Sequence, residues 1–170
     1  MMNTDLFWIP GPWRGRLAII PRPRGGDWLE DEASGWRRAG IDIVVSLLEN
    51  EEAAQLELLS EPDAAGANSI RFISFPIPDR GVPASTPAAL SLMADLADAL
   101  DQGENVAVHC RQSVGRAGLI AAGVLTTAGM NPQHAIDAVS SARGLTVPET
   151  SEQREWVRMI RPEAVLSGPN

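Results

Sequence analysis

Short β-branched runs alternate with segments of helical length along most of this 170-residue chain. Residues 41–47 (IDIVVSL) and 105–109 (NVAVH) are apolar runs of the kind found in buried parallel strands. Residues 116–127 are apolar on nearly all sides, which is typical of a helix in the middle of a domain. Strands that alternate with helices predict an α/β fold, with a central, mostly parallel sheet flanked by helices.

Local signals predict the other elements. A helix capped by Asp27 should run to about residue 39 and end at Gly40. Its apolar stripe contains Trp28, Leu29 and Trp36. The remaining expected elements are a small β-structure from 6–9 and 16–20, a helix at 51–59, a strand at 70–75, a loop at 76–83, a helix capped by Thr86, and helices that begin near Asn131 and Thr150.

Length and charge limit the classes of function. A chain of this length predicts one domain over residues 1–170, of which residues 1–40 are less distinct. The net charge of -8 argues against a nucleic-acid partner, because phosphate backbones attract basic surfaces. No basic segment precedes a long apolar run, and the longest apolar stretch, near residues 119–130, is too short to span a bilayer. We therefore expect a cytoplasmic protein with no membrane partner.

Cys110 is the only cysteine, and it lies between the strand at 105–109 and the helix at 116–127. A single thiol excludes an internal disulfide, so Cys110 is either an inert buried side chain or a nucleophile. In a strand–loop–helix turn, several backbone N–H groups converge at the helix N-terminus and form an anion-binding site, which also favours the thiolate. The planar guanidinium of Arg116 can bind two oxygens of a tetrahedral anion.

The segment HCRQSVGRAG at residues 109–118 resembles the signature of cysteine-based protein tyrosine and dual-specificity phosphatases, in particular bacterial dual-specificity-like members. The resemblance covers about residues 41–157. It implies a phosphate monoester hydrolase that acts through a phosphocysteine on Cys110, with His109 in support through hydrogen bonds to backbone groups. The substrate would be a phosphorylated protein or a small phosphate monoester, and neither a cofactor nor a metal is implied. The implied phosphate-binding loop consists of Arg111, Gln112, Ser113, Val114, Gly115 and Arg116.

Two further segments resemble loops of this family. In FPIPDRGVP at residues 75–83, the resemblance implies that Asp79 protonates the leaving oxygen. The alternative is that Asp79 only belongs to a turn. In VPETSEQ at residues 147–153, the resemblance implies that Gln153 orients the hydrolytic water, whereas Thr150 and Gln153 also fit a helix capping box.

Two positions depart from the family pattern. Ala117 stands where a Ser or Thr usually donates a hydroxyl to the thiolate, so we expect slow breakdown of the phosphocysteine. Ser113 stands where Gly usually adopts an unusual backbone conformation, and its hydroxyl is a candidate replacement for the missing one. Around the pocket, Arg80 and Arg111 either attract a dianion or are solvated. Arg22 and Arg24 form either part of a substrate rim or only a turn.

Two other functions compete with this interpretation. One is a catalytically impaired phosphate-binding module, which Ala117 and Ser113 would explain. The other is a rhodanese-like sulfurtransferase, which also uses a cysteine loop closed by an arginine. Sulfur transfer has no use for a leaving-group acid, so Asp79 favours the phosphatase.

Overall fold

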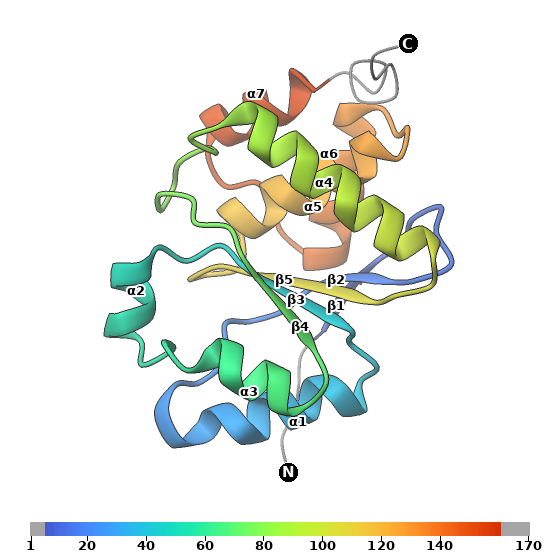
Figure 1. Ribbon diagram of the computed structural model, residues 1–170. Coiled ribbons are helices and arrows are strands. Elements are labelled where there is room, and N and C mark those ends of the chain that lie inside the picture. Colours follow the sequence, from blue (N-terminus) through green and yellow to red (C-terminus); the bar gives the residue numbers. More distant parts are fainter. Residues whose placement is uncertain (1–5, 161–170) are drawn as a thin grey trace.

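The computed structural model describes residues 6–160, and these form a single α/β domain built on one five-stranded sheet (Figure 1). The strand order is β1-β2-β5-β3-β4, and every pair is parallel except β1 with β2. The predicted fold class is therefore confirmed. Residues 1–5 and 161–170 of the predicted domain lie outside the described residues. The strands are β1 Phe7–Ile9, β2 Leu17–Ile19, β3 Ile43–Ser46, β4 Arg71–Ser74 and β5 Val106–His109.

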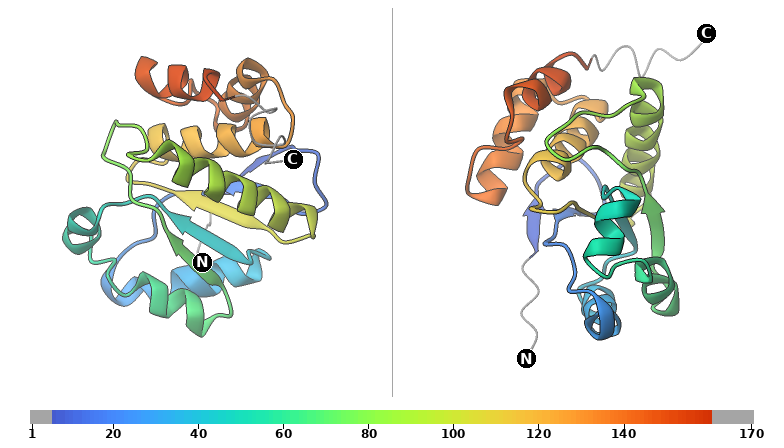
Figure 2. Two further views of the ribbon diagram at one scale, coloured as in Figure 1. Left: turned by 45° about the horizontal axis from the view of Figure 1, so that its top comes forward. Right: turned by 90° about the vertical axis from the view of Figure 1, so that its left-hand side faces the viewer.

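Helices cover both faces of the sheet (Figures 1 and 2). On one face lie α4 Thr86–Asp101, α5 Gly115–Thr127, α6 Pro132–Arg143 and α7 Ser151–Arg158. On the other lie α1 Leu29–Arg38 and α3 Glu61–Ala67, while α2 Asn50–Gln55 lies beside the edge at which the parallel strands end. Among the described helices, none is both long and apolar enough to cross a membrane.

The core consists of two apolar clusters separated by the sheet. Successive strand side chains point to opposite faces, so Ile43 and Val45 pack under α4 and α5 while Val44 packs against α1 and α3. Every residue of α5 is buried, as its uniformly apolar sequence predicts. This helix therefore fixes the position of the loop that precedes it.

The segment around α1 differs from the prediction. Asp27 does not cap a helix; it lies inside a 3₁₀ turn, Gly26–Trp28, and α1 begins one residue later. Trp28 does not join the apolar stripe: it is 51% exposed, and the Arg24 guanidinium lies 4.2 Å from its ring centre. Trp36 is buried and Gly40 has a φ of 89°, as expected of a helix end.

Two other helix boundaries were also predicted wrongly. The helix expected at 51–59 ends at Gln55, Glu57 adopts a positive φ of 57°, and α3 follows with Pro62 in its first turn. At α4, the hydroxyl of Ser85 accepts a hydrogen bond from the Ala88 N–H. Ser85 is therefore the cap, and Thr86 is the first helical residue.

Candidate active site

The candidate site lies where β5 ends and α5 begins. Cys110 directly follows β5 and is 2% exposed, and the residues up to Gly115 form the loop that enters α5. Within residues 6–160, no backbone N–H of residues 111–114 has a protein acceptor. Unpaired N–H groups at the positive end of a buried helix make a site for an anion.

Ser113 adopts the backbone conformation for which glycine is usually used. Its φ is 56°, and its buried hydroxyl donates to the Ile20 carbonyl over 2.5 Å. That hydrogen bond offsets part of the strain of a non-glycine residue with positive φ. It also commits the hydroxyl to Ile20, so the expectation that Ser113 replaces the hydroxyl missing at Ala117 is not met.

Two arginines hold the outer side of the loop. Arg22 Nη1 donates to the Arg111 carbonyl over 2.9 Å, and Arg143 Nε donates to the Ser113 carbonyl over 2.9 Å. Arg22 thus belongs to the loop's support, a role that the sequence did not indicate. Arg24 instead pairs with Glu32 at 2.6 Å.

Arg116 joins the start of α5 to the Leu47 carbonyl just after β3, to α2 and to the loop of Asp79. Its side chain is 1% exposed, and Nη1 donates to the Ile77 carbonyl over 2.8 Å. Nη1 and Nη2 donate to the two carboxylate oxygens of Glu52, over 2.6 and 2.9 Å. Nη2 also donates to Asp79 Oδ1 over 3.1 Å. The structure therefore places Asp79 beside Arg116, as the predicted site requires.

Glu52 was not identified from the sequence, although it is the main partner of Arg116. The hydrogen bonds from Arg116 hold the pKa of the Glu52 carboxyl below its ordinary value, against the effect of burial. Burial disfavours the charged Arg116, but the bonds to Glu52 and the negative groups nearby raise its pKa further. One feature of the sequence could have identified Glu52: it follows β3, and β3 pairs with β5, the strand that leads to Cys110.

The loop that carries Asp79 contains the turn that was the alternative interpretation. The Gly81 N–H donates to the Pro78 carbonyl over 2.8 Å, and Arg80 has a φ of 61° and pairs with Glu149 at 3.3 Å. The turn and the contact with Arg116 coexist, because Asp79 remains 56% exposed at the tip of the loop. The side chain is thus accessible to a substrate.

Gln153 joins this loop to α7. It forms the predicted capping box: its N–H donates to Thr150 Oγ1 over 3.1 Å, and its Oε1 accepts from the Thr150 N–H over 3.2 Å. In addition, Nε2 donates to the Gly81 carbonyl over 2.9 Å. The side chain is fully buried and packs over the start of α5, since a Cβ on Gly115 would lie 2.8 Å from Gln153 Oε1.

His109 has a different partner from the one expected. Nε2 of its fully buried ring lies 2.6 Å from Oε2 of Glu61, which is equally buried, where backbone partners were predicted. Within residues 6–160, Nδ1 has no hydrogen-bond partner. Glu61 was missed because α3 was not predicted.

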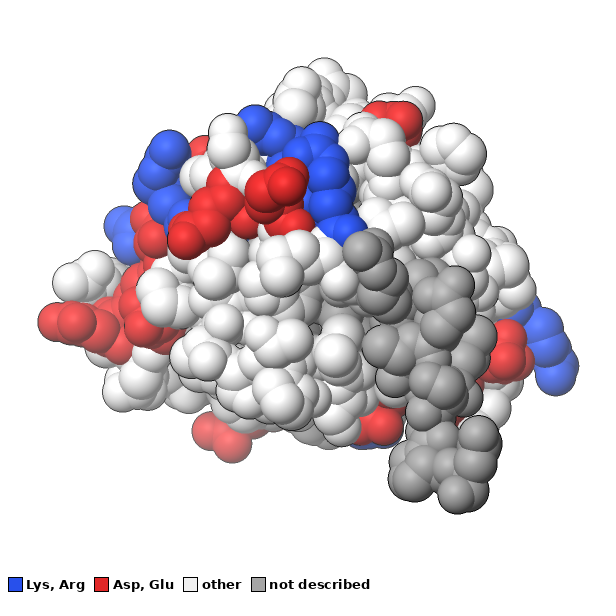
Figure 3. Space-filling view, turned by 90° about the horizontal axis from the view of Figure 1, so that it is seen from above, with Lys and Arg blue, Asp and Glu red and all other residues white. Residues whose placement is uncertain are grey.

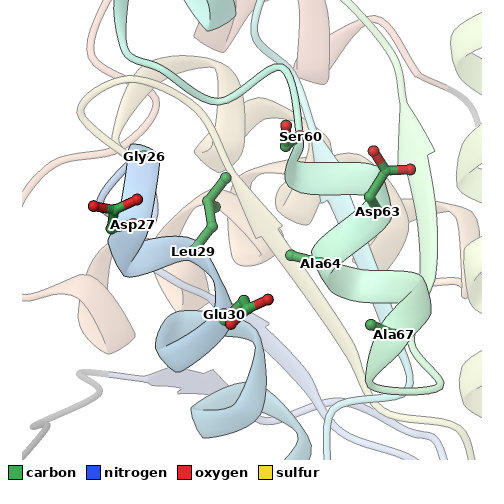
Figure 4. Close-up of a pocket in the computed structure, with 8 residues that line it drawn as sticks. All are labelled: Gly26, Asp27, Leu29, Glu30, Ser60, Asp63, Ala64 and Ala67. Atoms are coloured by element: carbon green, nitrogen blue, oxygen red, sulfur yellow. The ribbon is translucent and has the colours of Figure 1, made fainter.

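Arginine and acidic side chains are interleaved on the left of Figure 3, the side on which β3 and β5 end. Arg111 lies near an acidic partner, with Nη1 4.0 Å from Glu52 Oε2. A cavity of about 650 Å³ lies elsewhere, between α1 and α3 beneath the sheet (Figure 4). Leu29 points into it, and no predicted site residue lines it. No group of metal-ligating side chains occurs in residues 6–160.

The fold and this site together indicate a class of protein, and a comparison with known protein families gives the same class. The model described as "Swiss Army Knife protein, DSP-PTPase phosphatase domain" (PTP-SAK) matches residues 8–169, so the chain belongs to this family. The predicted resemblance to dual-specificity phosphatases is thereby confirmed.

Particular relatives support the same class. Cyclin-dependent kinase inhibitor 3 of Rattus norvegicus is 32% identical over 88 residues, which is 51% of this chain but only 41% of that protein. A structure of kinase associated phosphatase with its catalytic-site cysteine changed to serine has a TM-score of 0.84 and 18% identity, covering 92% of this chain and 93% of that one. Tk-PTP in its active form has a TM-score of 0.69 and 27% identity, with 83% and 88% covered.

Proposed function

We propose that this protein is a cysteine-dependent phosphatase that hydrolyses phosphate monoesters in two steps. Membership of a phosphatase-domain family supports the general activity. The observation that carries the proposal is the convergence of three groups: the unpaired N–H groups of residues 111–114, the buried guanidinium of Arg116 and the carboxyl of Asp79 on that guanidinium.

In the first step, the Cys110 thiolate attacks phosphorus and the bond to the leaving oxygen breaks. The loop N–H groups and Arg116 stabilise the charge on the equatorial oxygens. Asp79 gives a proton to the departing oxygen. His109 supports the strand end from which Cys110 projects, through its bond to Glu61.

The hydrogen bonds of Arg116 suggest how substrate binding prepares Asp79. Its two terminal nitrogens donate to protein acceptors on Leu47, Glu52, Ile77 and Asp79. An arriving phosphate therefore takes the place of the more exposed partner, Asp79, while Glu52 keeps hold of the guanidinium. The released carboxyl is then free to reach the leaving group.

In the second step, water attacks the phosphocysteine, Asp79 accepts its proton, and inorganic phosphate leaves. Gln153, whose buried amide donates to the Gly81 carbonyl, holds the Asp79 loop in position for this step. Ala117 offers no hydroxyl to the departing thiolate, and Ser113 is bonded to Ile20. Breakdown of the phosphocysteine is therefore the slower step.

The substrate class that we propose is a phosphotyrosine or phosphoserine/threonine protein or a small phosphate monoester. The net charge of -8 disfavours nucleic acid, and we propose a cytoplasmic location.

Hydrolysis of aryl phosphates tests the proposal. Turnover of p-nitrophenyl phosphate should be lost in Cys110→Ser. Asp79→Asn should lower kcat/KM, which reports the first step, by about 10²–10⁴-fold for phenyl phosphate and much less for p-nitrophenyl phosphate, whose leaving group needs no proton.

The absence of turnover would overturn the proposal. If the wild type binds inorganic phosphate in calorimetry without hydrolysing any aryl phosphate, the chain is a phosphate-binding module, an alternative that Ala117 favours. Transfer of sulfur from thiosulfate to cyanide would instead identify a sulfurtransferase.

A further inference from the structure

Two carbonyl groups of the loop at residues 111–114 accept hydrogen bonds from arginines that lie outside it. Arg22 Nη1 donates to the Arg111 carbonyl, and Arg143 Nε donates to the Ser113 carbonyl, each over 2.9 Å. The arginines are 89 and 30 residues away from their acceptors along the chain. Arg22 follows β2, whereas Arg143 is the last residue of α6, so two separate elements hold the loop.

The planarity of the peptide unit connects these contacts to the anion site. In a trans peptide, the C=O of one residue and the N–H of the next lie in one plane and point in opposite directions. The Arg111 carbonyl shares its unit with the Gln112 N–H, and the Ser113 carbonyl shares its unit with the Val114 N–H; both units are trans. A donor that holds either carbonyl on the outer side therefore turns the next N–H toward the anion.

Both arginines are themselves held in place. Pro21 and Pro23 flank Arg22, and the second proline restricts the Arg22 backbone to extended conformations. The Arg143 guanidinium lies 4.2 Å from the ring centre of Phe7, which favours the cation on that ring face. Donors that are fixed before the anion arrives reduce the ordering that binding requires.

The positive charge of the two arginines also favours an anion, but it acts on the whole loop. A hydrogen bond to one carbonyl instead fixes one peptide unit and the single N–H on its other side. Within residues 6–160, neither the Gln112 N–H nor the Val114 N–H has a protein acceptor, so each is available to an oxygen of the anion. The two effects therefore differ in which N–H groups they change.

We propose that Arg22 and Arg143 are positioning residues for the anion site. Arg22 orients the Gln112 N–H and Arg143 orients the Val114 N–H toward the phosphoryl oxygens. Neither arginine contacts the substrate. The consequence for turnover rests on the proposed phosphatase function, whereas the consequence for phosphate binding does not require turnover.

Titration of the ¹⁵N-labelled full chain with inorganic phosphate tests each assignment separately by NMR. In the wild type, the Gln112 and Val114 N–H resonances should both move downfield to saturation, because each group donates to a phosphate oxygen. In Arg22→Met, the Gln112 resonance should lose most of its shift at saturation while Val114 keeps its own. Arg143→Met should give the reverse. Methionine retains much of the aliphatic side chain and removes the donor.

Phosphate affinity, measured by calorimetry, provides the second readout. Each methionine variant should weaken binding about tenfold, which corresponds to about 1.4 kcal/mol for one lost hydrogen bond. Arg22→Lys and Arg143→Lys retain a donor and should restore most of the affinity. Arg158→Met is the matched control, because Arg158 bonds to Gln133 and Glu155 on α6 and α7; it should leave the Kd within about twofold.

Two results would overturn the proposal. One is an equal loss of both N–H shifts in both methionine variants, because general loosening of the loop or loss of charge acts on the two groups alike. The other is a phosphate Kd that neither variant changes. Circular dichroism checks that each variant is folded.

Failure of the proposed function gives a different result. A wild type that binds phosphate with these variant effects, yet hydrolyses no aryl phosphate, would exclude the phosphatase and support the roles of Arg22 and Arg143.

Discussion

Arg116 shows how much of the site depends on a single residue. Glu52 and Asp79 both bind its guanidinium, yet the two carboxylates differ in exposure: the Glu52 side chain is 12% exposed and that of Asp79 is 56% exposed. The buried partner positions the guanidinium, and the exposed partner is the one that a substrate can displace. Glu52 therefore keeps the Arg116 guanidinium in place, while the contact with Asp79 can be given up when a substrate binds.

The Glu52–Arg116 pair predicts a specific dependence of stability on pH. Because the pKa of Glu52 is lowered in the folded protein, its contribution is complete above its ordinary pKa and is lost as the pH falls from about 5 through the lowered value. Glu52→Gln should lower the free energy of unfolding at pH 7 by about 1–3 kcal/mol, because it leaves Arg116 buried without its main partner.

Urea denaturation of wild type and Glu52→Gln at pH 7, 5 and 4 measures this contribution. The difference between the two proteins should shrink as the pH falls below about 5. A difference that stays constant over this range would show that the carboxylate charge is not what stabilises the pair.

Ala117 predicts an abnormal second chemical step. In the wild type, stopped-flow hydrolysis of p-nitrophenyl phosphate should show a burst of p-nitrophenol, because the phosphocysteine forms faster than it breaks down. Ala117→Ser should raise kcat and shrink the burst, since a hydroxyl then donates to the departing thiolate.

Ser113→Ala is the control for Ala117→Ser. The Ser113 hydroxyl is bonded to Ile20, so this variant should leave the burst amplitude unchanged while lowering stability. A wild type without a burst would contradict the proposed order of rates.

At the scale of elements, α5 positions the site through the residues that pack against it. Gly118 lies under the segment that leads to α7, because a Cβ there would lie 3.0 Å from the Val147 Cβ and 3.5 Å from the Pro148 Cα. That segment leads to Gln153, whose amide binds the Gly81 carbonyl in the loop of Asp79. The close approach of α5 therefore sets where two other site elements lie.

Gly118→Ala should separate α5 from this segment. Overpacking of this kind costs about 1–3 kcal/mol, which a shift of the urea midpoint measures. Gly66→Ala is a control on α3, where an added Cβ meets no atom within 4 Å; it should raise stability by about 0.5–1 kcal/mol through helix propensity. Equal midpoints for the two variants would show that the contact with Val147 is not limiting.

At the scale of the whole molecule, an acidic chain presents a local anion site. The net charge is -8, yet Arg22 and Arg143 donate to carbonyls of the Cys110 loop and Arg116 lies at the start of the helix that follows it. The average charge therefore discourages polyanions, while the unpaired loop N–H groups and Arg116 still favour one small dianion.

Binding of phosphate should stabilise the entire fold, because the loop is tied to β2, α2 and α6. At a phosphate concentration ten times its Kd, mass action contributes about 1.4 kcal/mol, which raises the Tm of a domain of this size by about 3–6 °C. Scanning calorimetry with phosphate, against sulfate-free buffer of equal ionic strength, measures the shift. Arg116→Ala should abolish it, and an unchanged shift in that variant would place the anion elsewhere.

The sequence by itself determined the features that depend on near neighbours. Alternating apolar runs predicted the α/β class, the buried strand and helix on either side of Cys110 predicted the loop between them, and Thr150 with Gln153 predicted a capping box. Each of these follows from patterns within about one element, where backbone geometry dictates which side chains share a face.

Only the tertiary structure decided which distant groups complete the site. Because β5 lies between β2 and β3, Ile20 and Arg22 reach the loop of Cys110 from one side, and Glu52 reaches Arg116 from the other. The same order places Glu61 against His109. Side chains with no local signal become partners when the strands that precede them are neighbours, and the order of those strands is set by packing of the whole core.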